Sequence, residues 1–522
     1  MFLTLGAALE MVLLLWLGLS PRFAHELPGD TAAILSFMAL YGLAFLIYVA
    51  AVAVVAKGGG RLWAIIFFAV LFRVTLLPSF QVLENDLYRY LWDGKVLAHG
   101  HNPYLVSPAD VERPEESCHP SEARALHALA KQDERPRHAF PDLGGSCVAP
   151  VYPPYFDWIG HRAVPTIYPP LAETVFALAY LIDPGNLYVM KALFVLFDLL
   201  TLWLLIASLP RLGLSVNWCL LYAWSPLVLK EFANSGHLDS LPVFLVTLAF
   251  YLLMRSRPIW ASVTLALGCL SKLYPVLLLP VFIRRLGWKG VAVFALVVAA
   301  GYAPFLGIGL GSASAGLRTY AAEWEFNSSL FYLCYSLVFD KLISAPLDRG
   351  GRVAIDALAA TKLLMTGILA AIVCALCAAK ARRAIRKQPE SDLDLAWQSL
   401  ALLGALLLLS PVTNAWYLAM LFPFLCVWPM RSWILLSGLI VLAYAFHLPP
   451  EDFARAATRL AEASSWLSFL PADADTWRAI LWFHVRWLEY VPFYALLAWE
   501  GLTWPRRRPP ATKPLELDLP TA

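Results

Sequence analysis

The chain has 522 residues, of which 60% are hydrophobic and 15% are charged, and its mean hydropathy is +0.64. This balance excludes an ordinary soluble domain, and the lack of alternating apolar and polar segments excludes a membrane β-barrel. The formal net charge of +3 does not indicate a partner, because membrane topology accounts for the basic residues. We therefore predict an all-α polytopic membrane protein with about 12–14 transmembrane or partly inserted helices.

Apolar segments near the length of a bilayer span recur along the whole chain. We expect them near residues 1–19, 32–56, 62–77, 188–208, 215–230, 239–254, 259–283, 290–308, 354–379, 395–409, 414–430, 432–447 and 479–500. Several are shorter than the roughly 20 residues of a full span, so some helices are predicted to be only partly inserted.

Three of the segments need a separate interpretation. Residues 1–19 lack the basic start and the cleavage site of a signal peptide, so we keep them as a membrane helix, with a cleaved signal as the alternative. Polar residues at 271–275 interrupt the run 259–283, which predicts two half-helices or a tight hairpin. The segment 171–182 is too short to cross alone and is predicted to dip into the outer leaflet and return.

Basic residues in the loops set the orientation of the segments. They fall on one face if 171–182 does not span and the interrupted run returns to its starting side. Both termini are then cytoplasmic, and the long loop 78–170 lies on the outer face. We divide the chain into N-terminal membrane helices (1–77), a first large periplasmic loop (78–170), a membrane helix core (171–447), a periplasmic surface segment (448–478), a last membrane helix (479–503) and a disordered cytoplasmic tail (504–522).

Two of the eight cysteines, Cys118 and Cys147, lie in the long outer loop. If this loop faces an oxidising compartment, the two form a disulfide, and otherwise they are free thiols; the sequence leaves both alternatives open. Cysteines in the outer loop and arginines on the inner side suit a bacterial inner membrane, with the outer face toward the periplasm.

A dense polar stretch at 84–95 directly follows the third apolar segment. It contains Glu84, Asp86, Arg89 and Asp93 at the mouth of a membrane helix. Ionisable residues in such positions are energetically unfavourable and are typical of functional sites. Asp86 is the hardest of them to explain as a structural anchor, so we consider it the first candidate for a catalytic group.

Five further polar clusters are predicted on the same outer face. They lie at 168–173, 230–239, 271–275, 324–329 and 410–417. Each member has a structural alternative, because lysines can reach lipid headgroups, aromatic residues can anchor at the interface and His237 can cap a helix. The convergence of six clusters on one face nevertheless indicates a functional site.

The sequence lacks the signatures of several soluble enzyme classes. It contains no P-loop, no GxGxxG after a strand, no GxSxG and no HExxH. His99 and His101 are two residues apart without a carboxylate at ligand spacing, which disfavours a zinc site there. This pattern favours a donor substrate that needs no nucleotide-binding fold.

Five motifs, taken in order, resemble the GT-C superfamily of polyprenyl-phosphate-sugar-dependent glycosyltransferases. They are NDLYRYLWDGKV (85–96) with HNPY (101–104), IYPPLA (167–172), KEFANSGHLD (230–239), SKLYPVLLLP (271–280) and WEFNSSL (324–330). The resemblance is closest to bacterial and archaeal polyprenyl-phosphate-mannose-type α-1,2 mannosyltransferases. It implies an active site at the outer membrane face, inverting transfer, and an acid in the first large external loop, here Asp86, as catalytic base.

The chemistry of sugar transfer from a lipid phosphate suggests roles for the other residues. A base must deprotonate the acceptor hydroxyl, and cationic or hydrogen-bonding groups must receive the departing phosphate. Our candidates are Arg89, Lys230 and Lys272 for the phosphate, Glu84, His237, Asp239 and Asn327 for sugar hydroxyls or for tuning Asp86, and Trp92, Tyr168, Tyr274, Trp416 and Tyr417 for the remaining donor contacts.

Two points limit what the resemblance implies. Members of the class often carry His-Pro before the late Trp-Tyr, whereas this chain has Asn414 and Ala415 there, so a catalytic histidine is not carried over to that position. A divalent metal ion, Mg²⁺ or Mn²⁺, shared by Asp86 and Asp239 is an alternative that no spacing rule requires.

The sequence therefore predicts a membrane enzyme that transfers a hexose, with mannose favoured, from a polyprenyl-phosphate donor to a glycan or a lipid-linked acceptor. No nucleic-acid partner is expected. The first alternative is a transporter or flippase of lipid-linked saccharides, which predicts charges near the bilayer midplane and internal repeats. The second is a non-catalytic partner in envelope assembly, for which the Asp86 cluster would be unnecessary.

Overall fold

The structure is a computed structural model that describes residues 1–23, 30–132, 154–309, 311, 314–339, 357–464 and 469–503. Across these ranges the chain is helical and forms no strand, apart from one isolated bridge between Phe326 and Val412. The predicted tail 504–522 lies outside the described residues, as does Cys147, and with it the predicted disulfide to Cys118. The all-α class is confirmed.

Six helical stretches of the described chain are long and apolar enough to cross a membrane. They are Phe2–Phe23, Thr31–Ala56, Leu187–Leu212, Tyr274–Gly307, Ala357–Ile385 and Asp392–Leu409. A seventh candidate is the pair Arg431–His447 and Pro450–Glu462, whose two arms meet at 89°. The shorter apolar helices are Leu62–Leu76, Pro170–Ile182, Ser240–Met254, Pro258–Ser271 and Ala415–Leu425. The chain is therefore a polytopic α-helical membrane protein.

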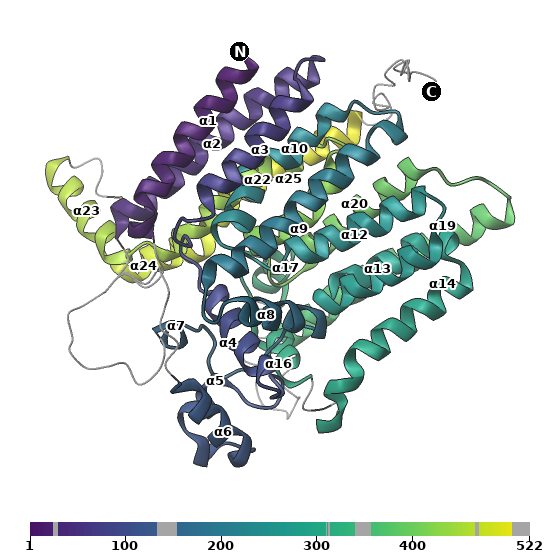
Figure 1. Cartoon of the computed structure of the whole chain (residues 1–522). Helices are drawn as coiled ribbons and strands as arrows, with labels where there is room; N and C mark the ends of the chain where they lie inside the picture. The colour runs from purple at the N-terminus through teal and green to yellow at the C-terminus, as the bar shows by residue number, and fades with distance from the viewer. Residues whose placement is uncertain are drawn as a thin grey trace, which may run out of the picture.

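The helices of the bundle leave one end of the molecule to the polar elements (Figure 1). The bundle contains α1 (Phe2–Leu19), α2 (Thr31–Ala56), α3 (Leu62–Leu76), α9 (Leu187–Ser208), α10 (Leu220–Ala223), α11 (Pro226–Val228), α12 (Ser240–Met254), α13 (Pro258–Ser271), α14 (Leu279–Tyr302), α17 (Leu330–Cys334), α19 (Ala357–Ile385), α20 (Asp392–Leu409), α21 (Phe422–Leu425), α22 (Arg431–Leu439) and α25 (Arg486–Thr503). The remaining helices are α4 (Asp86–Ala98), α5 (Pro108–Glu112), α6 (Pro120–Ala130), α7 (Pro154–Asp157), α8 (Pro170–Ile182), α16 (Ala315–Glu323), α23 (Pro450–Ala463) and α24 (Ala474–Ala479).

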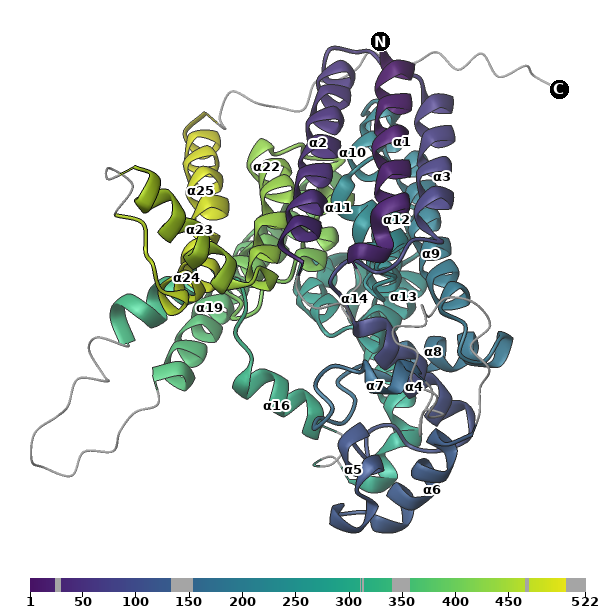
Figure 2. The same cartoon turned by 90° about the vertical axis from the view of Figure 1, so that its left-hand side faces the viewer.

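The start of α1 and the end of α25 lie in the upper half of both overall views, whereas α4, α5, α6 and α16 lie in the lower half (Figures 1 and 2). In Figure 2, α1, α2 and α3 run side by side, and α1 packs against both of the others. The loop that was predicted to carry the first polar motif is thus at the opposite end of the bundle from the start of the chain.

The break predicted near 271–275 is confirmed. Helix α13 ends at Ser271, and Lys272 is extended with φ −160° and ψ 146°. Pro275 has no backbone N–H to continue an α-helix, so the chain resumes as the 3₁₀ helix η6 (Tyr274–Leu278) before α14. Gly287, with φ 64° and ψ 176°, breaks the helix again inside α14.

Three of the predicted apolar segments are not continuous α-helices in the structure, a detail that the prediction did not include. The segment 215–230 breaks at Ser225–Pro226 and continues as the π-helix η5 (Leu229–Asn234). The segment 414–430 begins as the 3₁₀ helix η9 (Ala415–Leu421), and the last helix starts at Arg486 rather than 479, after the π-helix η12 (Ile480–His484). The 3₁₀, α and π helices differ in which carbonyl each backbone N–H bonds to. Hydropathy indicates only burial in lipid or protein, so it does not predict these departures.

A separate apolar cluster fastens the outer loop to the bundle. The Tyr90 ring stacks on Phe176 of α8 at 4.5 Å, and Trp92 packs edge-on against Phe156 at 4.7 Å. The Trp92 side chain is buried by this packing. This burial argues against the donor contact for which the sequence made Trp92 a candidate.

One buried ion pair lies among the membrane helices, between Arg73 of α3 and Asp198 of α9. Nε of Arg73 is 2.5 Å from Oδ2 of Asp198, and its Nη2 is 3.0 Å from Oδ1. Nη1 donates to the carbonyls of Ala69 and Ala223 at 3.0 and 2.9 Å. The pair holds α3, which leads into the outer loop, against α9 and α10.

Candidate active site

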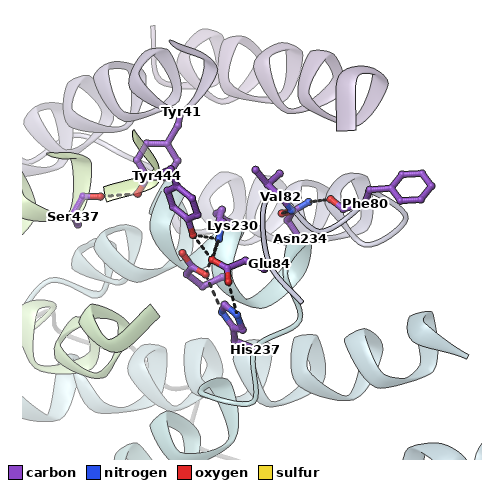
Figure 3. A network of polar contacts seen from close by, with 10 residues as sticks. Tyr41, Phe80, Val82, Glu84, Lys230, Asn234, His237, Ser437 and Tyr444 are labelled. Atoms are coloured by element: carbon purple, nitrogen blue, oxygen red, sulfur yellow. Dashed lines mark hydrogen bonds and ion pairs between the residues drawn. The ribbon is translucent and has the colours of Figure 1, made fainter. Parts of the chain in front are cut away.

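The segment between α3 and α4 is held by two buried polar side chains. Nδ2 of Asn234 donates to Ser79 Oγ at 2.7 Å and to the Phe80 carbonyl at 2.6 Å, and its Oδ1 accepts from Val82 N at 3.2 Å. Lys191 donates to the Ser79 carbonyl at 2.8 Å. Figure 3 shows Asn234 between Phe80 and Val82. These bonds fix the backbone that carries the next residues, Glu84 to Asp86.

The π-helix η5 presents two adjacent ionisable side chains to this segment. Both Lys230 and Glu231 are buried, and single π-helical turns of this kind are frequent at functional sites. The chain then turns at Gly236, with φ 69°, and a Cβ there would lie 2.8 Å from Lys191 Cγ. Glycine is therefore required at this turn, which brings His237 back toward η5.

Five residues form what we call the Lys230 cluster: Glu84, Lys230, Glu231, His237 and Tyr444 (Figure 3). Lys230 Nζ is 3.2 Å from Glu84 Oε1 and 3.2 Å from Glu231 Oε2, and it also contacts the Tyr444 hydroxyl. That hydroxyl donates to Glu84 Oε1 at 2.6 Å. Two carboxylates thus share one ammonium group, which compensates much of the unfavourable burial of charge.

His237 completes the cluster as a neutral ring. Its Nδ1 is 2.9 Å from Glu231 Oε2 and its Nε2 is 4.0 Å from Glu84 Oε2, and among the described residues neither nitrogen makes a well-directed hydrogen bond. Burial lowers the pKa of His237 to about 3. The ring packs against Trp416, with centroids 4.1 Å apart.

Asp86 is the first residue of α4 and lies beside this cluster. Its side chain is partly exposed, and within the described ranges it takes part in no hydrogen bond or ion pair. Desolvation raises the pKa of Asp86 to about 7, the charges of Glu84 and Asp239 add to the rise, and Lys272 and Lys230 oppose it. The carboxylate is therefore an available base whose pKa is close to neutral pH.

The broken helix after α13 places a second cation near Asp86. Lys272 Nζ is 2.7 Å from Asp239 Oδ1 and lies 4.2 Å from the centre of the Tyr417 ring. The Lys272 side chain is 23% exposed, whereas Lys230 is fully buried. The hydroxyl of Tyr274 in η6 is buried and, as far as the structure describes the chain, has no partner.

Arg89 is bound within the outer loop. Its Nε lies 2.8 Å from both carboxylate oxygens of Asp93, and its Nη1 donates to the Val164 carbonyl at 2.9 Å. Tyr168 packs edge-on against Tyr90 at 5.2 Å, and its carbonyl accepts from the Tyr104 hydroxyl at 2.6 Å. The guanidinium therefore ties α4 to the end of the outer loop through Nε and Nη1, whereas its buried Nη2 has no hydrogen-bond partner among the described residues.

Asn327 contacts a different helix from the other candidates. Nδ2 of Asn327 donates to Glu489 of α25 at 2.9 Å, and its carbonyl accepts from Tyr490 at 2.9 Å. The neighbouring Phe326 pairs with the 410–417 loop, because its N–H donates to Pro411 and its carbonyl accepts from Thr413. Phe326 thus pairs the two external loops, Asn327 attaches the first of them to α25, and none of the Asn327 hydrogen bonds among the described residues goes to the Asp86 region.

A family comparison bears on what this geometry does. The sequence model of glycosyltransferase family 87 matches residues 166–411. The match supports a membrane glycosyltransferase of the GT-C type, and it leaves the sugar and the lipid carrier unassigned. No curated protein and no solved structure matches the chain.

The glycosyltransferase match covers part of the site. Lys230, His237, Asp239 and Lys272 fall inside the matched range, as do Tyr168, Tyr274 and Asn327. Asp86, with Glu84 and Arg89, precedes it, and Trp416 and Tyr417 follow it. The role of Asp86 therefore rests on the geometry around it and on the motif NDLYRYLWDGKV (85–96).

Some side chains of the site are of the kinds that bind metal ions. Glu84, Glu231 and His237 place ligand atoms within 4.8 Å of one another, a set that suits a divalent transition metal. The Lys230 ammonium already lies between the two carboxylates, so the set as arranged does not fit a metal ion. Asp239 is paired with Lys272, and the metal shared by Asp86 and Asp239 stays a prediction.

Three residues of this candidate site were missed in the sequence. Glu231 stands next to Lys230 in KEFANSGHLD, and its charge in an apolar segment was a usable signal. Tyr444 lies in an ordinary apolar segment, and Tyr320, whose hydroxyl is 2.8 Å from that of Tyr417, lies in a loop that carried no motif. Only the fold brings these two tyrosines to the site.

Proposed function

We propose that the chain transfers a hexose, mannose in the first instance, from a polyprenyl-phosphate donor to a glycan or lipid-linked acceptor, with inversion and with Asp86 as general base. The match to a glycosyltransferase family supports the reaction class. The observation that carries the general base is the Asp86 carboxylate, which is partly exposed, unpaired among the described residues and has a pKa raised to about 7. The donor, the sugar and the inversion rest on the resemblance of the five motifs.

In the proposed reaction, Asp86 takes the proton of the acceptor hydroxyl as that oxygen attacks the anomeric carbon. The bond between the anomeric carbon and the phosphate oxygen breaks, and polyprenyl phosphate leaves with the bonding electron pair. Attack from the face opposite the leaving group inverts the anomeric centre in one step, so no covalent enzyme intermediate is needed. A base of this kind contributes about 10²–10⁴-fold to the rate.

Lys272 is the cation that we assign to the departing phosphate. It is partly exposed, close to Asp86 and located at the break between α13 and η6, where its ammonium group can meet a developing negative charge. Lys230 and Arg89 remain candidates by sequence, but each is held by internal carboxylates, so we assign them to fixing Glu84 and α4.

The membrane context follows from the topology that the sequence predicts. We propose a bacterial inner membrane, cytoplasmic termini and an active site that faces the periplasm. The position of α4, α5, α6 and α16 at the opposite end from the start of α1 supports a site on the other side of the membrane from the N-terminus.

The test is transfer of radiolabelled mannose from polyprenyl-phosphate-mannose by membranes that contain the wild type or Asp86→Asn. The substitution is nearly isosteric and removes the base, so kcat should fall by about 10²–10⁴-fold at unchanged expression. Asp475→Asn, at a side chain that is 90% exposed in α24, is the matched control and should leave transfer unchanged. Full activity of Asp86→Asn would remove Asp86 as the base, and no transfer by the wild type from any polyprenyl-phosphate sugar would favour the transporter.

A further inference from the structure

A row of aromatic side chains leads from the outer loop to the site. The His161 ring lies 3.9 Å from the Trp324 ring, and Trp324 lies 4.7 Å from Tyr320. The Tyr320 and Tyr417 hydroxyls are 2.8 Å apart, and Tyr417 is the ring that Lys272 contacts. The row thus connects three separate parts of the chain, and it ends beside the groups that flank Asp86.

The exposure of these rings changes along the row. His161 is exposed, and Trp324, Tyr320 and Tyr417 are each partly exposed. Burial raises the pKa of Tyr320 to about 12, the hydrogen bond to Tyr417 opposes the rise, and the charges of Asp239 and Asp86 add to it. The transfer step assigned above uses neither Tyr320 nor Trp324.

We propose that Trp324, Tyr320 and Tyr417 bind a sugar ring of the acceptor, so that the acceptor is a saccharide that reaches Asp86 from the side of His161. The inference rests on the proposed transferase function and specifies its second substrate. The indole of Trp324 is partly exposed beside the His161 and Tyr320 rings and supplies apolar surface for C–H groups of a pyranose, and the two tyrosine hydroxyls supply hydrogen-bond partners for its hydroxyls.

The contacts among these aromatic rings do not suit membrane anchoring or an acceptor without a sugar. Aromatic residues that anchor a membrane protein point separately toward lipid headgroups, whereas these rings contact one another and polar groups of the site. An acceptor without a sugar, such as a simple lipid alcohol, has hydrocarbon but no set of hydroxyls for Tyr320 and Tyr417. A saccharide has C–H groups that can contact the rings and hydroxyls that can hydrogen-bond to the two tyrosines.

The test compares two soluble acceptors with purified full-length protein and polyprenyl-phosphate-mannose in detergent. One acceptor is an alkyl mannoside, and the other is the alcohol with the same alkyl chain. The wild type should use the mannoside with a kcat/KM about a hundredfold higher, because only the mannoside has the ring. Trp324→Leu should raise the KM for the mannoside about tenfold, with kcat and the donor KM within about twofold of wild type.

Three variants keep the result interpretable. Trp324→Phe retains a ring and should raise the acceptor KM by no more than about threefold, and Tyr320→Phe, which removes one hydroxyl, should raise it by a similar factor. Trp288→Leu, at a tryptophan that is 78% exposed on α14, is the control and should leave every constant unchanged.

The outcomes separate this inference from the function on which it rests. Equal use of the alcohol and the mannoside, or an unchanged acceptor KM in both Trp324→Leu and Tyr320→Phe, would overturn the saccharide site while leaving the transferase intact. If the wild type neither transfers mannose nor releases it from the donor, the proposed function fails, and the acceptor site fails with it.

Discussion

Among the places where the described residues bury charged side chains, the Arg73–Asp198 pair and the surroundings of the Lys230 cluster differ in whether every polar atom has a hydrogen-bond partner. Arg73 and Asp198 form a closed pair, in which Nε and both terminal nitrogens of the arginine have acceptors and both carboxylate oxygens are used. Beside the Lys230 cluster, by contrast, the Asp86 carboxylate takes part in no hydrogen bond within the described residues, and the His237 nitrogens lack well-directed ones.

The comparison shows that a charge among membrane helices is not by itself evidence of function. A buried ion pair with complete partners can hold helices together, and its removal as a unit is often tolerated. Where most polar groups have hydrogen-bond partners, the few groups that lack a partner are the ones available to a substrate. On this ground we assign Arg73 and Asp198 to structure, and Asp86 to chemistry.

The largest effect is expected at the closed pair. Arg73→Met leaves Asp198 buried without a partner and should lower the free energy of unfolding by about 3–5 kcal/mol. The double variant Arg73→Met with Asp198→Leu removes both charges and should recover most of the loss. Thermal unfolding of the detergent-solubilised protein measures the first effect, and kcat of the folded double variant should be close to wild type. Activity lost in a well-folded double variant would contradict the structural assignment.

A smaller effect is expected at Tyr444, and Tyr41 provides its matched control. Both are buried tyrosines that donate one short hydrogen bond, Tyr444 to Glu84 and Tyr41 to the Ser437 carbonyl, each at 2.6 Å (Figure 3). Replacement of either by Phe should lower stability by about 1 kcal/mol. Only Tyr444→Phe should also lower kcat, by severalfold, because only its bond positions a residue that adjoins Asp86. Equal kcat values for the two variants would separate the Lys230 cluster from catalysis.

The smallest effect is expected at Asn234, whose side chain holds the segment before α4. Asn234→Asp keeps the size of the side chain but replaces the NH₂ that donates to Ser79 and Phe80 with an acceptor. We expect kcat to fall severalfold while the KM for the donor changes little, because the variant displaces Asp86 without removing a binding group. A changed donor KM at constant kcat would instead place Asn234 in the donor site.

Much of the site was predictable because its parts lie in short polar motifs between apolar segments. Asp86, Lys230, His237, Asp239 and Lys272 all stood out in this way, and the structure brings them together. The break at 271–275 was likewise visible, since Pro275 prevents a continuous helix.

The pairing of distant residues was not predictable from the sequence. Tyr444 is 360 residues from Glu84, and Asp198 is 125 residues from Arg73, so no local pattern connects them. The π-helix η5 was missed because its polar residues show that the segment is unusual but not which carbonyl each backbone N–H reaches. Asn327 shared a motif with the candidates, yet its side chain turns toward α25.

The most direct measurement of the central claim is the pH dependence of kcat/KM for mannose transfer. A base must be deprotonated to act, so the rate should rise by about tenfold per pH unit below the pKa of Asp86 and level off above about pH 7. Glu84→Gln removes a negative charge that raises this pKa, so the midpoint should move to lower pH. A flat profile in the wild type, or a midpoint that is the same in Glu84→Gln, would contradict the assignment of Asp86 as a base tuned by the Lys230 cluster.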